Sequence, residues 1–319
     1  MATVRALTLL LAMATAWPGS ARDLQAWDFV PSDHPAVRSL AFMNEFLQER
    51  VQGGLTIVRR VGNEHDTDSF VIGQVRNGTL DMARVNLAAL NVSVQGSLLA
   101  TLPFAFGSRE EMWRALDGQA REDILAGVQR EGLVGLSLYD GAARSFYSRS
   151  QAIRTVEDLK GLKVRVQSVG GWARVLQRLG AEPVVIPRAQ TKAALLAGVV
   201  DAADGDWATY MDEGHYEAAP FYSLTRHAHP PSVLIMSERT WRSLSGAEQT
   251  MLREAARASA VYKRGLVDEY EAELRQRAAA SGVRIHEDVD RKSFRDAMVP
   301  LAMDEAKLQK AMPRSEGGP

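Results

Sequence analysis

The sequence predicts an α/β protein of two lobes, with a mixed β-sheet in each lobe and one long helix that braces both. Three observations support this fold class. Strand-like and helix-like segments alternate in the first half, the same alternation returns in the second half, and a long uninterrupted helical pattern follows. The chain has 319 residues, which is enough for two domains.

The first half alternates between strands and helices. Residues 24–30 alternate in polarity and are rich in aromatic and aliphatic side chains, which is typical of a strand. The expected elements, in order, are a strand over 24–30, a helix over 31–53, a strand over 55–61, a helix over 66–79 and a strand over 80–86. This order implies a parallel or mixed sheet covered by helices.

The second half repeats the pattern in kind, without a sequence repeat. The expected elements are strands over 133–140 and 162–167, a helix over 170–180, a strand over 182–187, a helix over 188–200 and a strand over 233–237. Two α/β lobes account for this better than one.

The long helix begins at a capping box formed by Ser245 and Glu248. It meets no Pro or Gly until Gly265, and we expect it to continue to Ser281. Roughly 35 residues at 1.5 Å each give a length of about 50 Å, which exceeds the diameter of one small lobe. The helix should therefore contact both lobes.

The N-terminus predicts a secretory signal peptide over 1–21. Arg5 precedes an apolar run, and small residues at Gly19 and Ala21 indicate cleavage after Ala21. The run is too short to span a bilayer, and we expect no membrane-spanning helix in the mature chain. Removing the peptide takes away one positive charge and no acid, so the formal net charge moves from −1 to −2. This charge suggests neither nucleic acid nor an anionic membrane as a partner.

The composition and motifs restrict the possible chemistry. The chain has no cysteine, which excludes disulfides, thiolate metal sites and a cysteine nucleophile. We find no catalytic or nucleotide-binding motif and expect neither an enzyme nor a cofactor. Only His227 and His229 are close together among six histidines, and such a pair without a third ligand is a weak metal signal. The segment around Asp66 could offer oxygen ligands, but we expect no metal.

Two arginines raise the question of an anionic ligand. Strand alternation puts Arg165 on the same face as Lys163 and Gln167, so one interpretation is a solvated strand face. However, Arg144 directly follows the expected strand over 133–140, and α/β sheets place ligand-binding groups beyond the carboxyl ends of their strands. Two guanidinium groups that converge on a cleft would suit a carboxylate, because the planar fork matches its two oxygens.

The segment from Thr155 to His227 resembles the core of the solute-binding proteins of tripartite ATP-independent periplasmic (TRAP) transporters, DctP type. The motif D-x-K-G-[LM]-K-x-R is matched from Asp158 to Arg165, followed by L-G-A-x-P, A-L-x-x-G-V-x-D and T-x-H matches. In the first half, Q-x-x-x-G-x-[LI]-D-M is matched from Gln74 to Met82, and L-P-F-x-F from Leu102 to Phe106. The similarity covers nearly the whole mature chain.

This resemblance implies a periplasmic binding protein of type II-like fold. Its two lobes would close about a hinge on a small organic acid and hand that acid to an ion-coupled membrane permease. We expect lobe I over 22–145 plus about 232–265, lobe II over 146–231 plus about 266–310, and a flexible tail over 311–319.

The resemblance also implies site residues. Arg165 would be the main carboxylate clamp and Arg144 a second arginine at the ligand. Glu64 would contact ligand hydroxyls, His34 matches the first-loop position, and Asn86 is a further candidate contact.

The stretch from Asp204 to Tyr210 bears on the substrate. Members that resemble sugar-acid binders carry E-N-N-x-P-S-Y, whereas this chain has Asp204, Gly205 and Asp206 before Trp207 and Tyr210. The gap left by Gly205 could admit a bulkier ligand group or Trp207, and Trp207 could equally be a packing residue. Asp206 would accept hydroxyl protons and repel a second carboxylate.

These departures favour a hydroxylated monoacid such as a uronate or an aldonate. The alternatives are another carboxylate (a dicarboxylate, keto acid or aromatic acid), a sensor input protein, or an enzyme on sugar acids.

Overall fold

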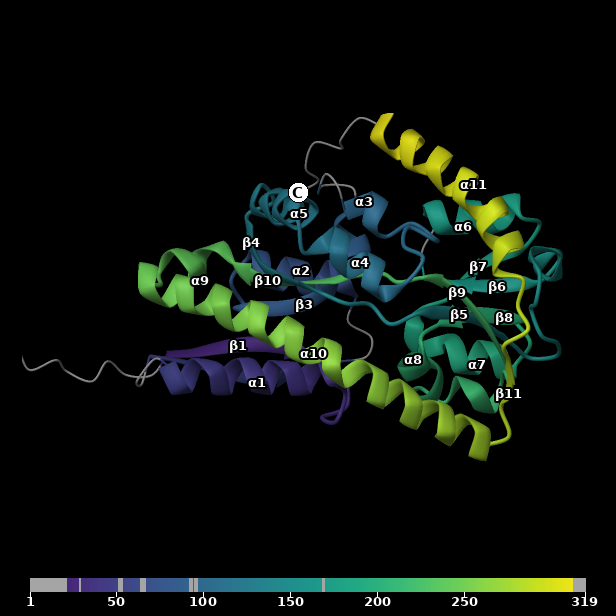
Figure 1. Ribbon diagram of the computed structural model, residues 1–319, viewed down its shortest axis with the longest axis horizontal. Helices are drawn as coiled ribbons and strands as arrows, with labels where there is room; N and C mark the ends of the chain where they lie inside the picture. The colour runs from purple at the N-terminus through teal and green to yellow at the C-terminus, as the bar shows by residue number, and fades with distance from the viewer. Residues whose placement is uncertain are drawn as a thin grey trace, which may run out of the picture.

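The structure is a computed structural model that describes residues 22–28, 30–50, 54–63, 67–91, 94, 97–167 and 170–311. These residues form two α/β lobes that lie side by side, each built around its own sheet (Figure 1). The expected signal peptide over 1–21 and nearly all of the expected tail lie outside the described residues. None of the described helices is long and apolar enough to cross a membrane.

The sheet of lobe I has the strand order β2-β1-β3-β10-β4. Its strands are β1 (Arg22–Asp28), β2 (Leu55–Val61), β3 (Met82–Asn86), β4 (Leu133–Tyr139) and β10 (Ser232–Ser237). Strands β1, β2 and β3 are parallel, while β10 runs antiparallel to β3 and β4. The sheet is therefore mixed, as predicted, and the carboxyl ends of β1 and β3 meet at one edge.

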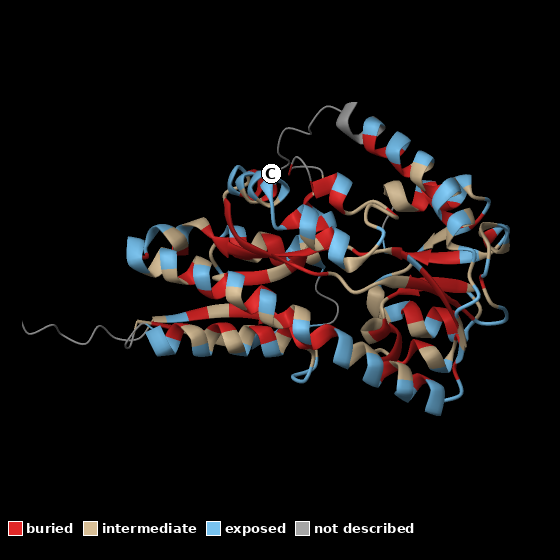
Figure 2. Cartoon of the chain, in the orientation of Figure 1, coloured by how far each residue is buried: buried red, intermediate tan, exposed pale blue. Residues whose placement is uncertain are grey.

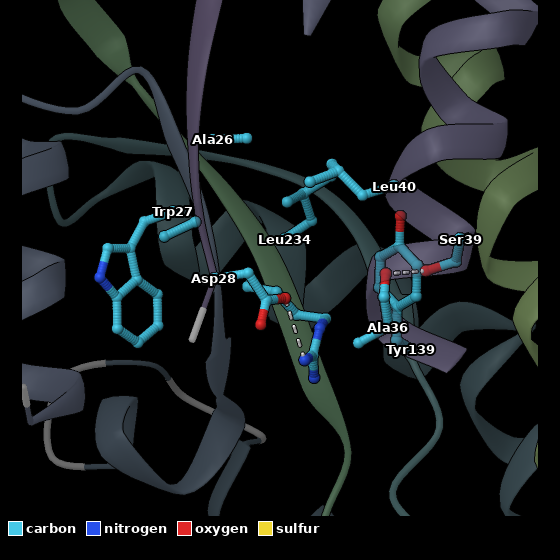
Figure 3. A pocket seen from close by; sticks show the side chains of 10 residues that line it. Ala26, Trp27, Asp28, Ala36, Ser39, Leu40, Tyr139 and Leu234 are labelled. Carbon is cyan, nitrogen blue, oxygen red and sulfur yellow. Dashed lines mark hydrogen bonds and ion pairs between the residues drawn. The ribbon is translucent and has the colours of Figure 1, made fainter. Parts of the chain in front are cut away.

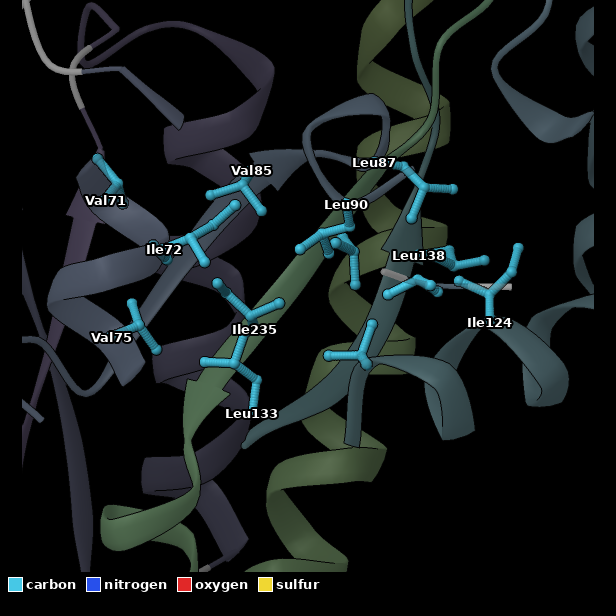
Figure 4. Packing of buried hydrophobic residues seen from close by; sticks show 14 of the residues in the cluster. Val71, Ile72, Val75, Val85, Leu87, Leu90, Ile124, Leu133, Leu138 and Ile235 are labelled. Carbon is cyan, nitrogen blue, oxygen red and sulfur yellow. The ribbon is translucent and has the colours of Figure 1, made fainter. Parts of the chain in front are cut away.

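Helices cover both faces of this sheet. One face packs on α2 (Asp68–Arg76), α4 (Arg109–Leu116) and α5 (Gln119–Gln129) through the cluster shown in Figure 4. The other face packs on α1 (Pro35–Arg50) and on the first half of the long helix. The short helices η1 (Leu87–Leu90), α3 (Ser97–Ala100) and α9 (Glu238–Arg242) complete the lobe.

The sheet of lobe II has the order β11-β9-β5-β8-β6-β7. Its strands are β5 (Arg144–Ser148), β6 (Lys163–Val166), β7 (Glu182–Val185), β8 (Ala202–Gly205), β9 (Phe221–Ala228) and β11 (Arg284–His286). One face packs on α7 (Thr191–Leu196) and α8 (Trp207–Asp212), and the other on α6 (Gly171–Arg178) and α11 (Arg291–Ala311). The remaining turns are η2 (Val156–Leu159), η3 (Arg188–Gln190) and η4 (His215–Glu217). Buried residues concentrate on the strands and on the helix faces that meet them (Figure 2).

The long helix α10 (Gly246–Ala280) has 35 residues and carries the predicted capping box of Ser245 and Glu248. Leu252 belongs to the core of lobe I, whereas Leu274 and Ala278 belong to the core of lobe II. The helix therefore braces both lobes, as expected from its length. Its middle is anchored by Lys263, whose buried ammonium group donates to Asp140 Oδ1 at 2.8 Å and to the Asp140 carbonyl at 3.0 Å.

Two chain segments besides α10 link the lobes. One runs from β4 to β5 through 140–143, and the other from β9 to β10 through 229–231. The two segments touch at Gly141, where a Cβ atom would lie 1.8 Å from the carbonyl oxygen of Pro230. No side chain fits between them, so the close approach requires glycine.

This contact predicts that Gly141→Ala destabilises the protein by about 1 to 3 kcal/mol, because backbone must move to accept the methyl group. The matched control is Gly265→Ala in α10, where a Cβ meets nothing within 4 Å. That change should stabilise the protein by about 0.5 to 1 kcal/mol through helix propensity. Urea unfolding of both variants measures the difference. A neutral Gly141→Ala variant would contradict the proposed packing of the two linking segments.

Candidate functional site

Arg165 lies in β6, between β8 and β7, and its side chain is buried rather than solvated. The residue is 7% exposed, although Lys163 and Gln167 on the same strand face are exposed. The guanidinium Nε donates to the carbonyl of Ile186 at 2.9 Å. Nη2 is buried and has no hydrogen-bond partner among the described residues. The interpretation of a solvated strand face is therefore wrong for Arg165, and the site holds a desolvated cation whose Nη2 lacks an acceptor among the described residues.

A buried N–H of a charged group is costly to leave without an acceptor, because it has lost its water. Burial lowers the pKa of Arg165, against the opposing influence of Tyr147 and Asp204. An arginine remains protonated in such surroundings, so the charge must be met by an acceptor rather than removed.

Arg144 and Asp204 form an ion pair with each other. Arg144 Nε donates to Asp204 Oδ2 at 2.7 Å, and its Nη2 donates to the Asp204 carbonyl at 2.6 Å. His227 Nε2 lies 3.5 Å from the same carboxylate oxygen. Although burial opposes ionisation most strongly, Arg144 and His227 hold the pKa of Asp204 well below its usual range. Two residues that the sequence suggested as separate ligand contacts are thus partners.

Arg144 follows β4 after the linking segment 140–143 and is the first residue of β5, which pairs with β9. The sequence signal for β5 is weak because the strand is short and begins with a charged residue.

The space beside Gly205 is filled by Tyr147 and Thr209. A Cβ atom at position 205 would lie 3.3 Å from Tyr147 Cε1 and 3.4 Å from the Thr209 side chain. Tyr147 is 1% exposed, and its hydroxyl is 2.8 Å from His215 Nδ1. Neither an open gap nor Trp207 occupies this position, so that expectation is wrong.

Trp207 and Tyr210 belong to the core of lobe II. The Trp207 ring stacks on Tyr222 at 4.0 Å between centroids. Tyr210 is fully buried, and its hydroxyl donates to the carbonyl of Ala219 at 2.9 Å. Trp207 is therefore a packing residue. The hydroxyl of Tyr210, its one polar side-chain atom, is hydrogen-bonded inside the core.

Asp206 is the N-cap of α8, where Oδ1 accepts from the Thr209 backbone N–H at 2.7 Å. Burial opposes its ionisation most strongly, yet the charge of Arg144 and the hydrogen bonds from Thr209 lower the pKa of Asp206. The charge of Asp206 also acts on His34 of lobe I. The charge of Asp206 therefore reaches across to the other lobe.

His34 directly precedes α1, and its Nδ1 accepts from the Ala36 backbone N–H at 3.1 Å. Its ring packs edge-on against Tyr270 of α10 at 5.4 Å. Burial, followed by the charges of Arg84 and Lys263, lowers the pKa of His34 to about 4. The imidazole is therefore neutral near pH 7 and presents Nε2–H as a donor.

The remaining lobe I residues lie at the carboxyl ends of β1 and β3. Arg84 Nη2 is 3.4 Å from Asp28 Oδ2, and both line a small pocket of about 10 Å³ with Ser39 and Tyr139 (Figure 3). Asn86 caps η1, with its Oδ1 accepting from the Ala88 N–H at 2.9 Å. The predicted ligand contact Glu64 lies outside the described residues.

The sequence did not indicate three polar residues near the boundary, which are Asp68, Arg188 and Glu213. Asp68 begins α2 and accepts from the Asn86 backbone N–H at 3.4 Å, and burial raises the pKa of Asp68. Arg188 follows β7 and donates from Nε to Glu213 Oε1 at 2.7 Å. The charge of Arg188 acts on Asp68 of lobe I and on Asp206 of lobe II. The rule that pointed to Arg144, a charged residue just after a strand, would also have found Arg188.

Arg165 differs from three neighbouring arginines because it has no carboxylate contact among the described residues. Among the described residues, the paired cations are Arg84 with Asp28, Arg144 with Asp204 and Arg188 with Glu213. Arg165 has a carbonyl partner only, and its charge is matched by no carboxylate contact in the described part of the chain. The same residues contain no group of three or more His, Asp or Glu that could hold a metal ion. The arrangement is suited to receive one anionic group.

Residues 28–308 match the family of bacterial extracellular solute-binding proteins, family 7, or DctP. The chain belongs to this family. A curated relative, a solute-binding protein of Chromohalobacter salexigens, is 28% identical over 92% of this chain and 88% of the relative. The 2,3-diketo-L-gulonate-binding periplasmic protein of Escherichia coli is 28% identical over 84% of this chain and 80% of the relative.

Solved structures of TRAP periplasmic solute-binding proteins have the same two-lobe fold. One from Bradyrhizobium, in complex with D-galacturonate, is 35% identical, with a TM-score of 0.83 over 91% of this chain and 100% of that chain. One from Roseobacter denitrificans, with bound β-D-glucuronate, is 31% identical, with a TM-score of 0.83 over 92% of this chain and 100% of that chain. This family consists of solute-binding proteins, and the predicted family and fold class are confirmed.

The buried His215 predicts a pH-dependent stability. Burial, followed by the charges of Arg165 and Arg188, lowers the pKa of His215 to about 4. The unfolded chain then binds more protons than the folded chain below about pH 6.5, so stability falls as the pH drops towards 4. Between neutral pH and pH 4, the His215→Asn variant should lose up to roughly 3 kcal/mol less free energy of unfolding than the wild type.

Urea unfolding of both proteins across this pH range is the measurement. Parallel stability curves for the wild type and His215→Asn would contradict the buried neutral state of His215.

Proposed function

We propose that the protein is the periplasmic solute-binding component of a TRAP transporter and that it binds a uronate between its lobes. The carboxylate of the ligand supplies the acceptor that Arg165 lacks. The signal peptide over 1–21 directs the chain to the periplasm, and the loaded protein delivers the acid to the membrane permease. The observation that carries the proposal is the buried, unpartnered Nη2 of Arg165. Relatives that are 31% and 35% identical, with bound glucuronate and galacturonate, support the choice of acid.

Lobe closure would strengthen this ion pair. The expected lobes, 22–145 plus about 232–265 and 146–231 plus about 266–310, would rotate about the segments 140–143 and 229–231 and the middle of α10. Closing removes water from around Arg165, and an ion pair gains strength as the local dielectric constant falls. The ligand shifts an existing equilibrium between open and closed forms by its higher affinity for the closed form.

Carboxylates from both lobes accept hydrogen bonds from the hydroxyl groups of the ligand. Asp206 from lobe II and Asp68 from lobe I are both acceptors near Arg188. Ionised carboxylates accept hydrogen bonds from sugar hydroxyls but repel a second acid group. Because Arg165 is a buried cation with no carboxylate contact in the described residues, a ligand with a single acid group would supply the missing partner.

Arg165→Ala is expected to weaken uronate binding by about 3 to 5 kcal/mol, or roughly two to three and a half decades in Kd. Arg165→Lys should not restore binding, because an ammonium group cannot make the two-pronged contact. Calorimetry with galacturonate and glucuronate measures this effect. The control is Arg178→Ala, which removes a half-exposed arginine of α6 in the same lobe. Wild-type affinity in both Arg165 variants would overturn the proposal.

The charge balance predicts selectivity against diacids. Wild-type protein should bind galacturonate about tenfold or more tightly than galactarate, its diacid counterpart, because the second carboxylate faces Asp206. Asp206→Asn keeps a good N-cap residue for α8 while removing the charge. In this variant the affinity for galacturonate should exceed that for galactarate by a smaller factor, as measured by competition between the two acids. An unchanged preference would exclude Asp206 as its cause.

A further inference from the structure

A second concave site lies on lobe I, away from the boundary between the lobes. It has a volume of about 250 Å³ and is bounded by α4, the start of α5 and the middle of α10 (Figure 1). Its floor is β4, the edge strand of the sheet of lobe I. None of the residues that line it belongs to the boundary site around Arg165. We call it the edge crevice.

The edge crevice has an apolar body. Trp113 and Leu116 of α4 form one wall, and Leu138 of β4 lies at the floor. Ala260 and Val261 of α10 form the opposite wall, and Val261 is 60% exposed. Leu116, Leu138 and Ala260 are almost fully buried, so the apolar surface that a ligand could reach is that of Trp113 and Val261.

Three guanidinium groups surround this apolar body. Arg264 donates to both carboxylate oxygens of Asp117, at 2.9 and 2.7 Å, and lies 3.3 Å above the centre of the Trp113 ring. Arg121 donates to Glu122 at 2.7 Å. Each of these two arginines therefore has its own carboxylate.

Arg257 is the cation left over. Its nearest carboxylate oxygen within the described chain is that of Glu122 at 3.8 Å, which is beyond hydrogen-bond distance and already bound to Arg121. Three guanidinium groups thus share two carboxylates. Arg253, one turn earlier on α10, adds to the crowding, because burial and then the charge of Arg257 lower the pKa of Arg253. An anion beside Arg257 would relieve this repulsion.

We propose that the edge crevice binds a small organic monoanion, with its carboxylate on Arg257 and its apolar body against Trp113 and Val261. The volume is below the roughly 300 to 1,000 Å³ of pockets for drug-sized ligands, which limits the occupant to a small aromatic or branched carboxylate. A carboxylate matches the planar fork of a guanidinium, and the ring of Trp113 offers an apolar face. This site is independent of the proposed uronate site.

Calorimetry with benzoate as the probe tests the proposal on the mature chain. Wild-type protein should bind benzoate saturably and its neutral analogue benzamide at least tenfold more weakly, since the carboxylate makes the charged contact. Arg257→Ala should weaken benzoate binding about tenfold, equivalent to about 1.4 kcal/mol. The Arg257 side chain is 57% exposed, so this change should not disturb folding. Val261→Trp, at the exposed mouth, should abolish binding by filling the space.

Two controls separate this site from the boundary site. Arg242→Ala removes an exposed arginine paired with Glu238 outside the crevice and should leave benzoate binding unchanged. Arg165→Ala should also leave benzoate binding unchanged while it weakens uronate binding. The proposal is overturned if wild-type protein shows no saturable benzoate binding, if Arg257→Ala binds like the wild type, or if Arg165→Ala abolishes benzoate binding. Uronate affinity in Arg257→Ala should equal that of the wild type.

Discussion

The burial of one guanidinium group in the sheet of lobe II is the constraint on which the rest of the site depends. Arg165 is 7% exposed, although Lys163 on the same strand face is exposed, so burial is particular to this position and not to the strand. The carbonyl of Ile186 accepts from Nε, and Nη2 is left for something that the described residues do not supply. A desolvated cation of this kind is stable only if an acceptor completes it.

The surrounding ion pairs determine which kind of acceptor can bind Arg165. The charge of Asp204 acts on Arg165, but this carboxylate is paired with Arg144 and lies 3.5 Å from His227 Nε2. Glu213 is held by Arg188 in the same way. These pairings keep the internal acids away from Arg165, and they leave Asp206 and Asp68 to face the lobe boundary. One spare positive charge beside two acceptor carboxylates is the arrangement that suits an acid with hydroxyl groups.

The aromatic side chains of Tyr147, Trp207 and Tyr222 explain how the chain tolerates its departures from the family pattern at 204–207. The missing side chain at Gly205 is compensated by the ring of Tyr147, whose hydroxyl is tied to His215. Tyr222 donates to the Gly205 carbonyl at 3.1 Å and stacks on Trp207. The substitutions at 204–207 therefore act together as one repacked unit, and a single reversal such as Gly205→Asn would meet a filled space.

The sequence by itself determined the alternation of strands and helices, the mixed sheet of lobe I and the length and cap of α10, because these depend on local periodicity and on short-range capping. It also pointed to Arg165, through a motif contained within eight residues from Asp158. Only the tertiary structure decided that Arg144 pairs with Asp204, that Tyr210 is buried in the core and that the charge of Arg188 acts on Asp68. Each of these relations joins residues distant in the chain, and they exist only because the order of strands in a sheet brings them together, which no local pattern encodes.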